Sequence, residues 1–340
     1  MGAAFRFVPY GEDILPSPGV LVLDVGMRTA PGVLDHHHPQ AEPECAASLV
    51  VRHPELVLGH DLAPLREVVT HRLPDFDALS AIFLALRLLE TRRVDPAMER
   101  LAAYAKLVDS ASLSPAIDLA ATPYAVLRAL FAGRKGPEEA ANEARVDEGL
   151  KFMRHLHARA ERGEDLVENR RLFAGIDRYE RAQRKVEGDH ARYLDNAGRG
   201  IKLRLRLPSA SGTGTKEVDG LVVRNPTSFL LKEWARRDRE NAPGGVGFGF
   251  LMANFMETRY ILGVDPSRGV RLKGLGDILN RREAEKRRET GRPFAAWYDG
   301  NCPLFDFRIV DSPQDPTALD FDEVLALLLE FGGPPPEESR

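Results

Sequence analysis

The sequence predicts an α/β protein: a mainly parallel sheet with flanking helices, then a helical connector and a smaller α+β C-terminal domain. Short apolar runs of strand length alternate with segments of helical periodicity in the N-terminal part, which is typical of a parallel sheet. A long charged segment without strand signals follows, and strand-like runs return only after residue 200.

Four short apolar runs near the N-terminus have the length and composition of buried strands. They lie at residues 5–8, 20–24, 33–34 and 67–70. Each run after the first ends at acidic or histidine side chains, and parallel α/β sheets place ligand groups at the carboxyl ends of their strands. Residues 77–90 and 96–108, which follow the last run, have apolar side chains at helical spacing.

The rest of the chain divides by the same signals. Residues 137–190 are charged and helical in pattern, which predicts one or two long connector helices. Strand-like runs follow at 201–207, 221–223, 258–264 and 305–310, with helices at 229–237 and in the charged stretch before the last run. The domain limits that we expect are 1–135, 136–198 and 199–331, with a Pro/Glu-rich disordered tail over 332–340.

Composition excludes several classes of protein. The 340 residues are 43% hydrophobic and 29% charged, and no apolar run approaches the roughly 20 residues that cross a bilayer. The first residues lack the apolar stretch of a secretory signal. The two cysteines, Cys45 and Cys302, lie far apart, which excludes a disulfide framework. We therefore expect a cytoplasmic protein with no membrane partner.

Two segments are locally basic although the net charge is −4. The stretch 273–292 is rich in Lys and Arg, and Lys202, Arg204 and Arg206 alternate with apolar residues. Each segment is either a solvated face of a helix or strand, or a surface that meets phosphates.

The segment His71-Arg72-Leu73-Pro74-Asp75-Phe76-Asp77 carries the densest set of candidate ligands. It lies where a predicted strand becomes a helix, so His71, Asp75 and Asp77 project from one turn. Hard divalent cations prefer oxygen ligands, and Mn and Zn also accept imidazole. The turn can therefore serve two adjacent cations. The alternative is that Asp75 or Asp77 only caps the helix.

A second set of candidate ligands follows the earlier strands. Asp24 ends one of them just before Gly26, and Asp35-His36-His37-His38 ends the next. Asp24 is otherwise a turn residue, and the histidines are otherwise an exposed polar loop. Asp109 follows the apolar helix at 96–108, where it is either a further ligand or an ordinary terminal acid.

Together these motifs resemble the DHH phosphoesterase superfamily, which includes family II inorganic pyrophosphatases, RecJ-type single-strand exonucleases, oligoribonucleases and exopolyphosphatases. The run His71…Pro74-Asp75-Phe76-Asp77 is similar to the family's His-x-Asn-Pro-Asp-x-Asp motif, and Asp35-His36-His37 is similar to the motif that names it. Asp24 and Asp109 resemble its two lone aspartates. In the family the His-Asp-Asp motif precedes Asp-His-His, whereas here that order is reversed.

The resemblance implies a role for each residue. Two cations, Mn²⁺ or Mg²⁺, would be bound by His71 and Asp75 on one side and by His36, Asp77 and Asp109 on the other, with Asp24 bridging them. Asp35 would orient a histidine from outside the ligand set, and His37 would face the substrate phosphate; His38 has no assigned role. Such a cation pair activates a water and clamps an in-line displacement at phosphorus.

Many members of the family add a substrate-binding domain, and three features of residues 199–331 are compatible with one. Arg224 would bind phosphate, Ser228 or Thr227 would cap a helix that suits an anion, and Gly245 would lie in a backbone nest. The alternatives are an ordinary capped helix and a flexible glycine turn. Trp297 and Tyr298 either stack on a base or pack against the last strand.

The leading hypothesis is an enzyme, a two-metal phosphoesterase that hydrolyses phosphodiester bonds of oligonucleotides or nucleotide derivatives. Its partner would be a phosphate-containing small molecule or a short single-stranded nucleic acid. The alternatives are a pyrophosphatase or polyphosphatase, a non-catalytic nucleotide-binding regulatory protein, and a single-zinc hydrolase that uses His36 and His38. The sequence leaves the natural substrate, the metal, exo or endo action and the oligomeric state open.

Overall fold

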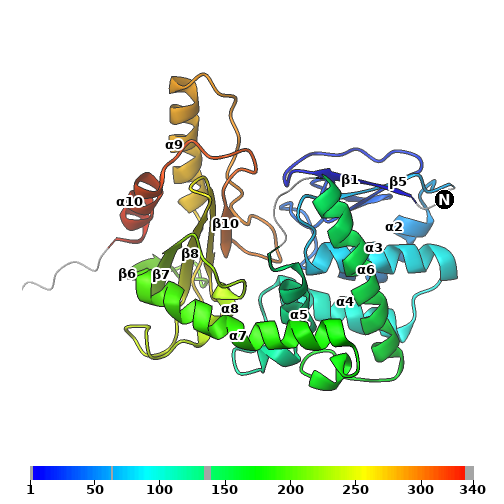
Figure 1. Ribbon diagram of the computed structural model, residues 1–340. Helices are drawn as coiled ribbons and strands as arrows, with labels where there is room; N and C mark the ends of the chain where they lie inside the picture. Colours follow the sequence, from blue (N-terminus) through cyan, green and yellow to red (C-terminus); the bar gives the residue numbers. More distant parts are fainter. Residues whose placement is uncertain (1–2, 63, 134–138, 334–340) are drawn as a thin grey trace, which may run out of the picture. The chain divides into compact units, whose positions relative to one another are not determined.

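The computed structural model describes residues 3–62, 64–133 and 139–333 (Figure 1). The chain divides into two compact units, Met1–Glu187 with Cys302–Leu304 and Gly188–Asn301 with Phe305–Arg340. Each unit contains one five-stranded sheet together with helices, so the protein is mixed α/β. The domain limits expected from the sequence stay predictions, and residues 334–340 of the expected tail lie outside the described residues.

The first unit is built around a mostly parallel sheet in the strand order β1-β5-β2-β4-β3. Its strands are β1 (Ala4–Val8), β2 (Val20–Leu23), β3 (Thr29–Ala30), β4 (Val33–Leu34) and β5 (Glu67–His71). The strands β1, β5, β2 and β4 pair in parallel, and β3 runs antiparallel to β4. Four strands therefore direct their carboxyl ends to one edge of the sheet.

Helices flank this sheet. They are α1 (Ala46–Arg52), α2 (Pro54–Leu58), α3 (Phe76–Thr91), α4 (Pro96–Asp109), α5 (Pro123–Phe131) and α6 (Glu139–Glu161), with short 3-10 turns η1 (Leu119–Ala121) and η2 (Arg170–Phe173). Helix α3 packs against β2 and β5, α1 against β4, and α6 against β1. Helix α3 also contacts α1, α4 and α6, and its largely apolar sequence is what a helix surrounded by other elements requires.

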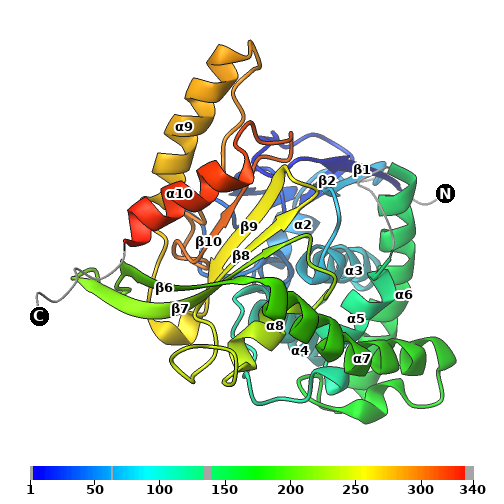
Figure 2. The ribbon, with the colours of Figure 1, turned by 60° about the vertical axis from the view of Figure 1, so that its left-hand side comes forward.

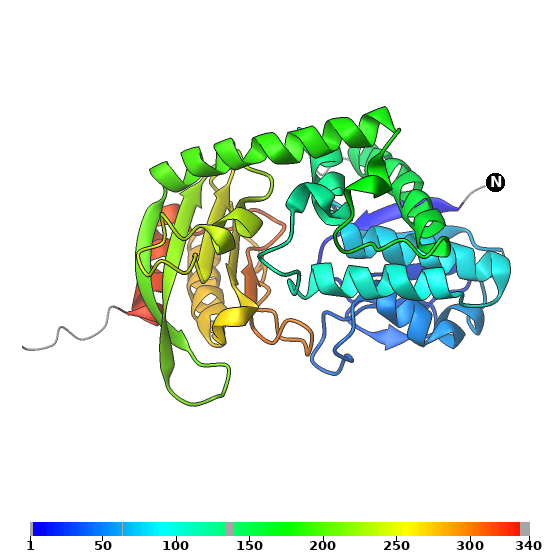
Figure 3. The same cartoon turned by 90° about the horizontal axis from the view of Figure 1, so that it is seen from below.

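Helix α7 (Asp177–Arg199) is one continuous helix (Figure 3), and the division between the units falls within it, after Glu187. Its buried side chains, which include Tyr179, Ala182, Val186 and Tyr193, recur every three or four residues. This spacing places them on one stripe of an otherwise charged helix.

The second unit contains a mixed sheet in the order β10-β9-β8-β7-β6. Its strands are β6 (Ile201–Pro208), β7 (Thr215–Arg224), β8 (Phe250–Phe255), β9 (Arg259–Val264) and β10 (Ile309–Asp311). Only the pair β7 and β8 is parallel among these neighbours. A 3-10 turn, η3 (Pro266–Arg268), follows β9.

Both faces of this second sheet are covered (Figure 2). Helices α9 (Leu275–Glu289) and α10 (Phe321–Gly332) share an apolar core with one face, to which Val222 of β7 contributes. Helix α8 (Leu231–Arg237) and the end of α7 share another core with the opposite face, to which Leu221 and Val223 contribute. Successive β7 residues thus point to opposite sides, as the pleat of a strand requires.

Several details of the second unit differ from the sequence predictions. The expected helix at 229–237 begins only at Leu231, and its start has no side-chain cap. The expected strand at 305–310 is instead Ile309–Asp311, because Asp306 and Phe307 have φ of 50° and 58°, in the left-handed region that interrupts a strand. Of the two alternatives for the aromatic turn, packing is the one observed. Trp297 is buried in the core and Tyr298 pairs with the last strand.

Two further expectations concern the whole chain. Cys45 and Cys302 are both buried, and neither forms a disulfide. Within the described ranges, no helix combines the length and apolar character needed to span a bilayer.

Candidate metal centre

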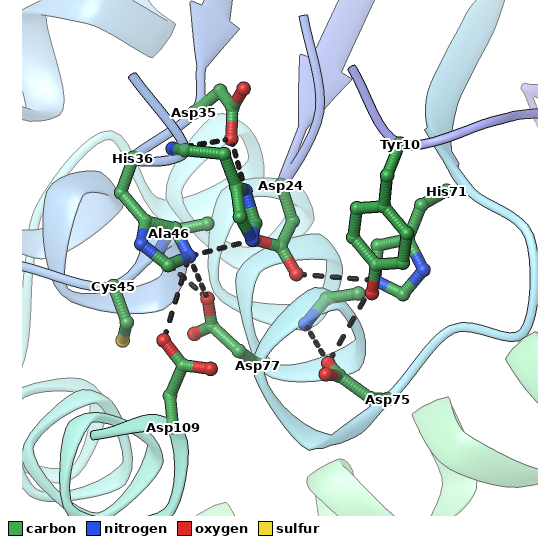
Figure 4. Close-up of polar contacts among 12 residues, drawn as sticks. Tyr10, Asp24, Asp35, His36, Cys45, Ala46, His71, Asp75, Asp77 and Asp109 are labelled. Carbon is green, nitrogen blue, oxygen red and sulfur yellow. Dashed lines mark hydrogen bonds and ion pairs between the residues drawn. The ribbon is translucent and has the colours of Figure 1, made fainter. Parts of the chain in front are cut away.

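The candidate ligands gather at the carboxyl edge of the first sheet (Figure 4). Asp24 directly follows β2, Asp35 and His36 directly follow β4, and His71 is the last residue of β5. Leu23 pairs with Leu34 across β2 and β4, so Asp24 and Asp35 leave the sheet side by side. The ligand residues at the ends of these apolar runs therefore form one cluster, because the strands are parallel neighbours.

Three further aspartates come from the ends of two helices. Asp75 is the N-cap of α3 and accepts a hydrogen bond from the N–H of Ala78 at 3.1 Å. Asp77, in the first turn of α3, accepts from the N–H groups of Ala46 and Ala47, at 2.7 and 3.0 Å, at the start of α1. Asp109 ends α4. The helix-cap alternative is thus true of Asp75, and capping does not remove it from the cluster.

Asp24 lies between the two histidines. Its Oδ1 is 3.2 Å from Nε2 of His36, and its Oδ2 is 3.2 Å from Nε2 of His71. The residue has a φ of 61°, an unusual backbone conformation for an aspartate, and it is almost fully buried. The two oxygens of one carboxylate therefore face two different imidazoles.

Each histidine also faces further carboxylates. Oδ1 of Asp75 lies 3.9 Å from Nε2 of His71. Oδ2 of Asp109 lies 3.5 Å, and Oδ2 of Asp77 3.9 Å, from Nε2 of His36. The donor groups that are compact enough to hold an ion are Asp24/His71/Asp75, His36/Asp77/Asp109 and Asp24/His36/His37. All six expected ligands are thus brought together.

Two buried carboxylate oxygens indicate whether the cluster is suited to bind a cation. Oδ1 of Asp24 and Oδ2 of Asp109 are buried and accept no hydrogen bond from the described residues. A buried carboxylate oxygen without a donor is costly, and the great majority of buried polar atoms have a partner. Divalent cations bind oxygen and imidazole ligands of this kind, so the residues present fit them.

The pKa values of the buried acids and histidines also indicate that the cluster needs positive charge. Burial opposes ionisation of Asp24, but its close contacts with His36 and His71 outweigh it and hold its pKa well below the usual range. Burial also opposes the charge of His71, yet contact with Asp24 raises its pKa to about 9. The pKa of His36 is raised likewise, chiefly by the charge of Asp109 and the contact with Asp24.

Two of the aspartates have pKa values that are raised, whereas the pKa of Asp24 is lowered. Burial, with the charge of Asp24 adding to it, raises the pKa of Asp77 well above its usual value. Burial also raises the pKa of Asp109 to about 7, although the nearby His36 opposes this shift. Each raised pKa marks a proton that the cluster retains and that a bound cation would replace.

Hydrogen bonds outside the ligand set fix two of the histidines. Nδ1 of His71 lies 2.8 Å from the carbonyl oxygen of Arg72, so its N–H donates there and Nε2 faces the carboxylates. Nδ1 of His37 lies 2.6 Å from Oδ1 of Asp35, whose Oδ2 accepts from the N–H of Met27 at 2.6 Å. Asp35 therefore orients His37 and does not enter the ligand groups.

The third histidine of the run lies apart from the cluster. Nε2 of His38 is 3.1 Å from the hydroxyl of Thr29. No compact donor group among the described residues includes His38. This geometry disfavours the single-zinc alternative, which needs His36 and His38 on one ion.

Two residues of the site had not been expected from the sequence. The hydroxyl of Tyr10 lies 3.0 Å from Nε2 of His71. Asn142 of α6 is buried, and its Oδ1 accepts from the N–H of Leu73, which has a φ of 59° in the turn before Asp75. Tyr10 follows the end of β1, a signal that the other strand ends share. Asn142 carries no such signal, because its partner is 69 residues away.

A fourth donor group lies elsewhere in the first unit and contains Asp95, His157 and Glu161. Here Nε of Arg87 is 3.3 Å from Asp95, and its NH2 nitrogen is 3.2 Å from Glu161. Asp95 also caps α4 by accepting from two backbone N–H groups. The guanidinium already supplies the positive charge, so this group is an ion-pair network.

The candidate substrate residues of the second unit are engaged within it. The Ser228 hydroxyl donates to Asp189 at 2.6 Å, and the N–H groups of the next two residues also donate to that carboxylate. The N–H of Gly245 donates to the carbonyl of Ala242. Arg224 lies over the ring of Phe321 at 4.5 Å. The structure gives no support to an anion site at Ser228 or Gly245, and the role of Arg224 stays a prediction.

Several residues of the basic segments pair with acids. On α9, Arg282 and Lys286 both contact Glu323. Arg287 is buried between Glu283 and Asp315. On β6, Arg204 pairs with Glu217. These contacts favour the interpretation of solvated, ion-paired faces over a phosphate-binding surface.

No protein-family model, curated protein or solved structure matches this chain. The resemblance to the DHH superfamily therefore rests on the motifs themselves.

Proposed function

We propose that this protein is a divalent-metal-dependent phosphoesterase of the DHH type. The observation that carries this proposal is the position of Asp24, whose two oxygens face two separate donor groups. A carboxylate shared between two adjacent ions is characteristic of sites that hydrolyse phosphoryl bonds with a pair of metals.

The two donor groups suggest how a pair of cations would be held. Asp24, His71 and Asp75 would bind one, and His36, Asp77 and Asp109 would bind the other, with Asp24 shared. Mn²⁺ or Mg²⁺ suits the predominance of carboxylate oxygens, and the imidazoles favour Mn²⁺. When bound, the pair supplies an activated water and neutralises charge on the phosphoryl oxygens.

We assign proton transfer to His37. Its Nδ1–H is held by Asp35 at 2.6 Å, and its ring lies 4.0 Å from that of His36, so the imidazole is oriented at the edge of the cluster. We assign to Nε2 of His37 the donation of a proton to the leaving oxygen as the P–O bond breaks. Asp35 acts through His37 as a positioning residue, because it fixes the tautomer and stabilises the protonated ring.

We propose two candidate substrate classes for this reaction. A phosphodiester of a short single-stranded oligonucleotide or a nucleotide derivative remains the leading substrate, and pyrophosphate or polyphosphate is the alternative. The pairing of Arg282 and Arg287 of α9 with acids weakens the argument from charge for a long polyanion. Comparing rates on substrates of both kinds is therefore the direct way to separate them.

Hydrolysis by metal-stripped and Mn-reloaded protein tests the proposal. The substrates are a chromogenic phosphodiester, a short single-stranded oligonucleotide and pyrophosphate, and the variants are Asp75→Ala and Asp95→Ala. Both aspartates are N-caps, so Asp95→Ala controls for the loss of a helix cap. We expect Mn-dependent turnover from the wild type and Asp95→Ala, and a loss of about a hundredfold or more in Asp75→Ala.

Two results would contradict the proposal. Unchanged turnover in Asp75→Ala would remove this residue, and with it the first donor group, from the reaction. A Mn²⁺ content well below roughly one ion per wild-type chain after reloading would favour the non-catalytic regulatory alternative.

A further inference from the structure

Tyr10 is an exposed aromatic residue at the centre that the proposed function leaves without a role. It comes two residues after Val8, which pairs with His71 across β1 and β5, so the sheet register places Tyr10 beside that histidine. The Tyr10 ring stacks on His71 with centroids 4.2 Å apart and meets the edge of His37 at 5.4 Å. The residue is 38% exposed, so a dissolved ligand can reach it.

The hydroxyl of Tyr10 competes for one particular atom. Nδ1 of His71 donates to the carbonyl of Arg72, and the phenol oxygen of Tyr10 lies 3.0 Å from Nε2 on the other side of the ring. The same Nε2 lies 3.2 Å from Asp24 and 3.9 Å from Asp75. A cation in this donor group would bind to Nε2 and would displace the hydroxyl that lies beside it.

The displaced hydroxyl would remain at the site. The contacts of the Tyr10 ring with His71 and His37 do not depend on the O–H hydrogen bond. A phenol is a neutral donor with one O–H, and an anionic phosphoryl oxygen is a strong acceptor for it. The hydroxyl would then lie within reach of an oxygen bound next to the first donor group.

We infer that Tyr10 is a phosphate-binding residue whose hydroxyl contacts Nε2 of His71 in the metal-free protein and donates to a phosphoryl oxygen in the metal-loaded protein. This inference rests on the proposed function, because it requires a cation in the Asp24/His71/Asp75 group. It assigns a substrate contact to the side of the cluster where Tyr10 lies beside His71 and Asp75 (Figure 4).

The first experiment titrates metal-stripped protein with Mn²⁺ by calorimetry in the wild type, Tyr10→Phe and Tyr260→Phe. Tyr260 donates its hydroxyl to the carbonyl of Glu257 in the second unit, so it controls for the loss of one tyrosine hydrogen bond. We expect Tyr10→Phe to bind Mn²⁺ about two- to tenfold more tightly, because no hydroxyl has to leave its contact with Nε2 of His71. The tyrosine absorbance change on adding Mn²⁺ should disappear in this variant alone.

The second experiment titrates the Mn-loaded proteins with inorganic phosphate. We expect Tyr10→Phe to bind phosphate about three- to tenfold more weakly than the wild type and Tyr260→Phe. If the wild type binds Mn²⁺ and phosphate but Tyr10→Phe matches Tyr260→Phe in either titration, the inference about Tyr10 is wrong and the proposed function stands. If the wild type binds no Mn²⁺, the proposed function itself fails.

Discussion

Two clusters of acidic and histidine side chains lie in the first unit, and they differ in the source of their positive charge. One surrounds Arg87, whose guanidinium contacts both Asp95 and Glu161. The other surrounds Asp24, and its acids contact only histidines among the ion pairs of the described residues. The acidic and histidine residue types alone do not distinguish the two clusters. They are distinguished by whether an arginine lies among the acids.

The protonation equilibria of the two clusters differ accordingly. Burial raises the pKa of Asp95, but the N–H of Met98, the charge of His157 and the contact with Arg87 outweigh it, so the net shift is downward. Burial raises the pKa of Asp109 to about 7, and the charge of Asp24 adds to the shift. A cluster that completes its own charge balance is an ion-pair network, and one that retains protons instead is a candidate ion site.

The largest expected effect comes from the shared carboxylate. Asp24→Asn keeps the shape of the side chain but removes its charge, so it should weaken Mn²⁺ binding by about a hundredfold or more. Metal analysis and calorimetry after reloading measure this effect. The matched change Asp95→Asn in the other cluster should leave metal content unchanged. Equal metal content in both variants would remove the distinction between the clusters.

The next effect is on stability. A ligand that binds only the folded state stabilises it, by about 2.7 kcal/mol at a concentration of a hundred times its Kd. Saturating Mn²⁺ should therefore raise the melting temperature of the wild type, and a chelator should reverse the rise. His157→Gln, which alters the Arg87 cluster, should keep the whole shift. A wild-type melting temperature that does not change when Mn²⁺ is added would contradict a cation at Asp24.

The third prediction concerns pH. His71 and Asp109 have pKa values raised to about 9 and about 7, so both retain protons that a cation must displace. Mn²⁺ affinity should therefore rise with pH between 6 and 8, by about tenfold per unit for each proton displaced. Calorimetry in buffers of different ionisation enthalpy would count the released protons. An affinity that does not change over this range would contradict the raised pKa values.

The smallest effect belongs to the Arg87 cluster. Arg87 is partly exposed, so Arg87→Met should lower the free energy of unfolding by about 0.5–1 kcal/mol and leave Mn²⁺ binding unchanged. Urea unfolding and the same metal titration measure the two quantities. Acquisition of a tightly bound cation by this variant would show that the two clusters differ only in their arginine.

The sequence indicates much of the cluster because its geometry follows from strand ends. Asp24, His36 and His71 each end an apolar run, and parallel pairing brings such ends together without regard to their order in the chain. The reversed motif order is therefore compatible with a shared site. Asp75 and Asp77 follow His71 within the same short turn of the sequence, so they lie near it.

Other features could not be inferred in this way. Asn142 meets Leu73 only because α6 packs near β1 and α3, which is a tertiary fact. Ser228 suggested a helix cap, but its hydroxyl donates a hydrogen bond to Asp189 of α7 instead. Asp306 and Phe307 lie in a run that suggested a strand, and their left-handed backbone dihedrals interrupt it. In each case a partner distant in sequence or a local dihedral decided the outcome.

The contact of Asp77 with the start of α1 has a spectroscopic consequence. The amides of Ala46 and Ala47 both donate to this carboxylate, each oxygen of which keeps a second lone pair. An ion drawn to Asp77 would polarise these two N–H bonds directly. Their amide resonances should therefore move when Mg²⁺ is added and broaden when Mn²⁺, which is paramagnetic, replaces it. The first turn of α1 would thus carry a built-in probe of ion occupancy that needs no label at the ligands themselves.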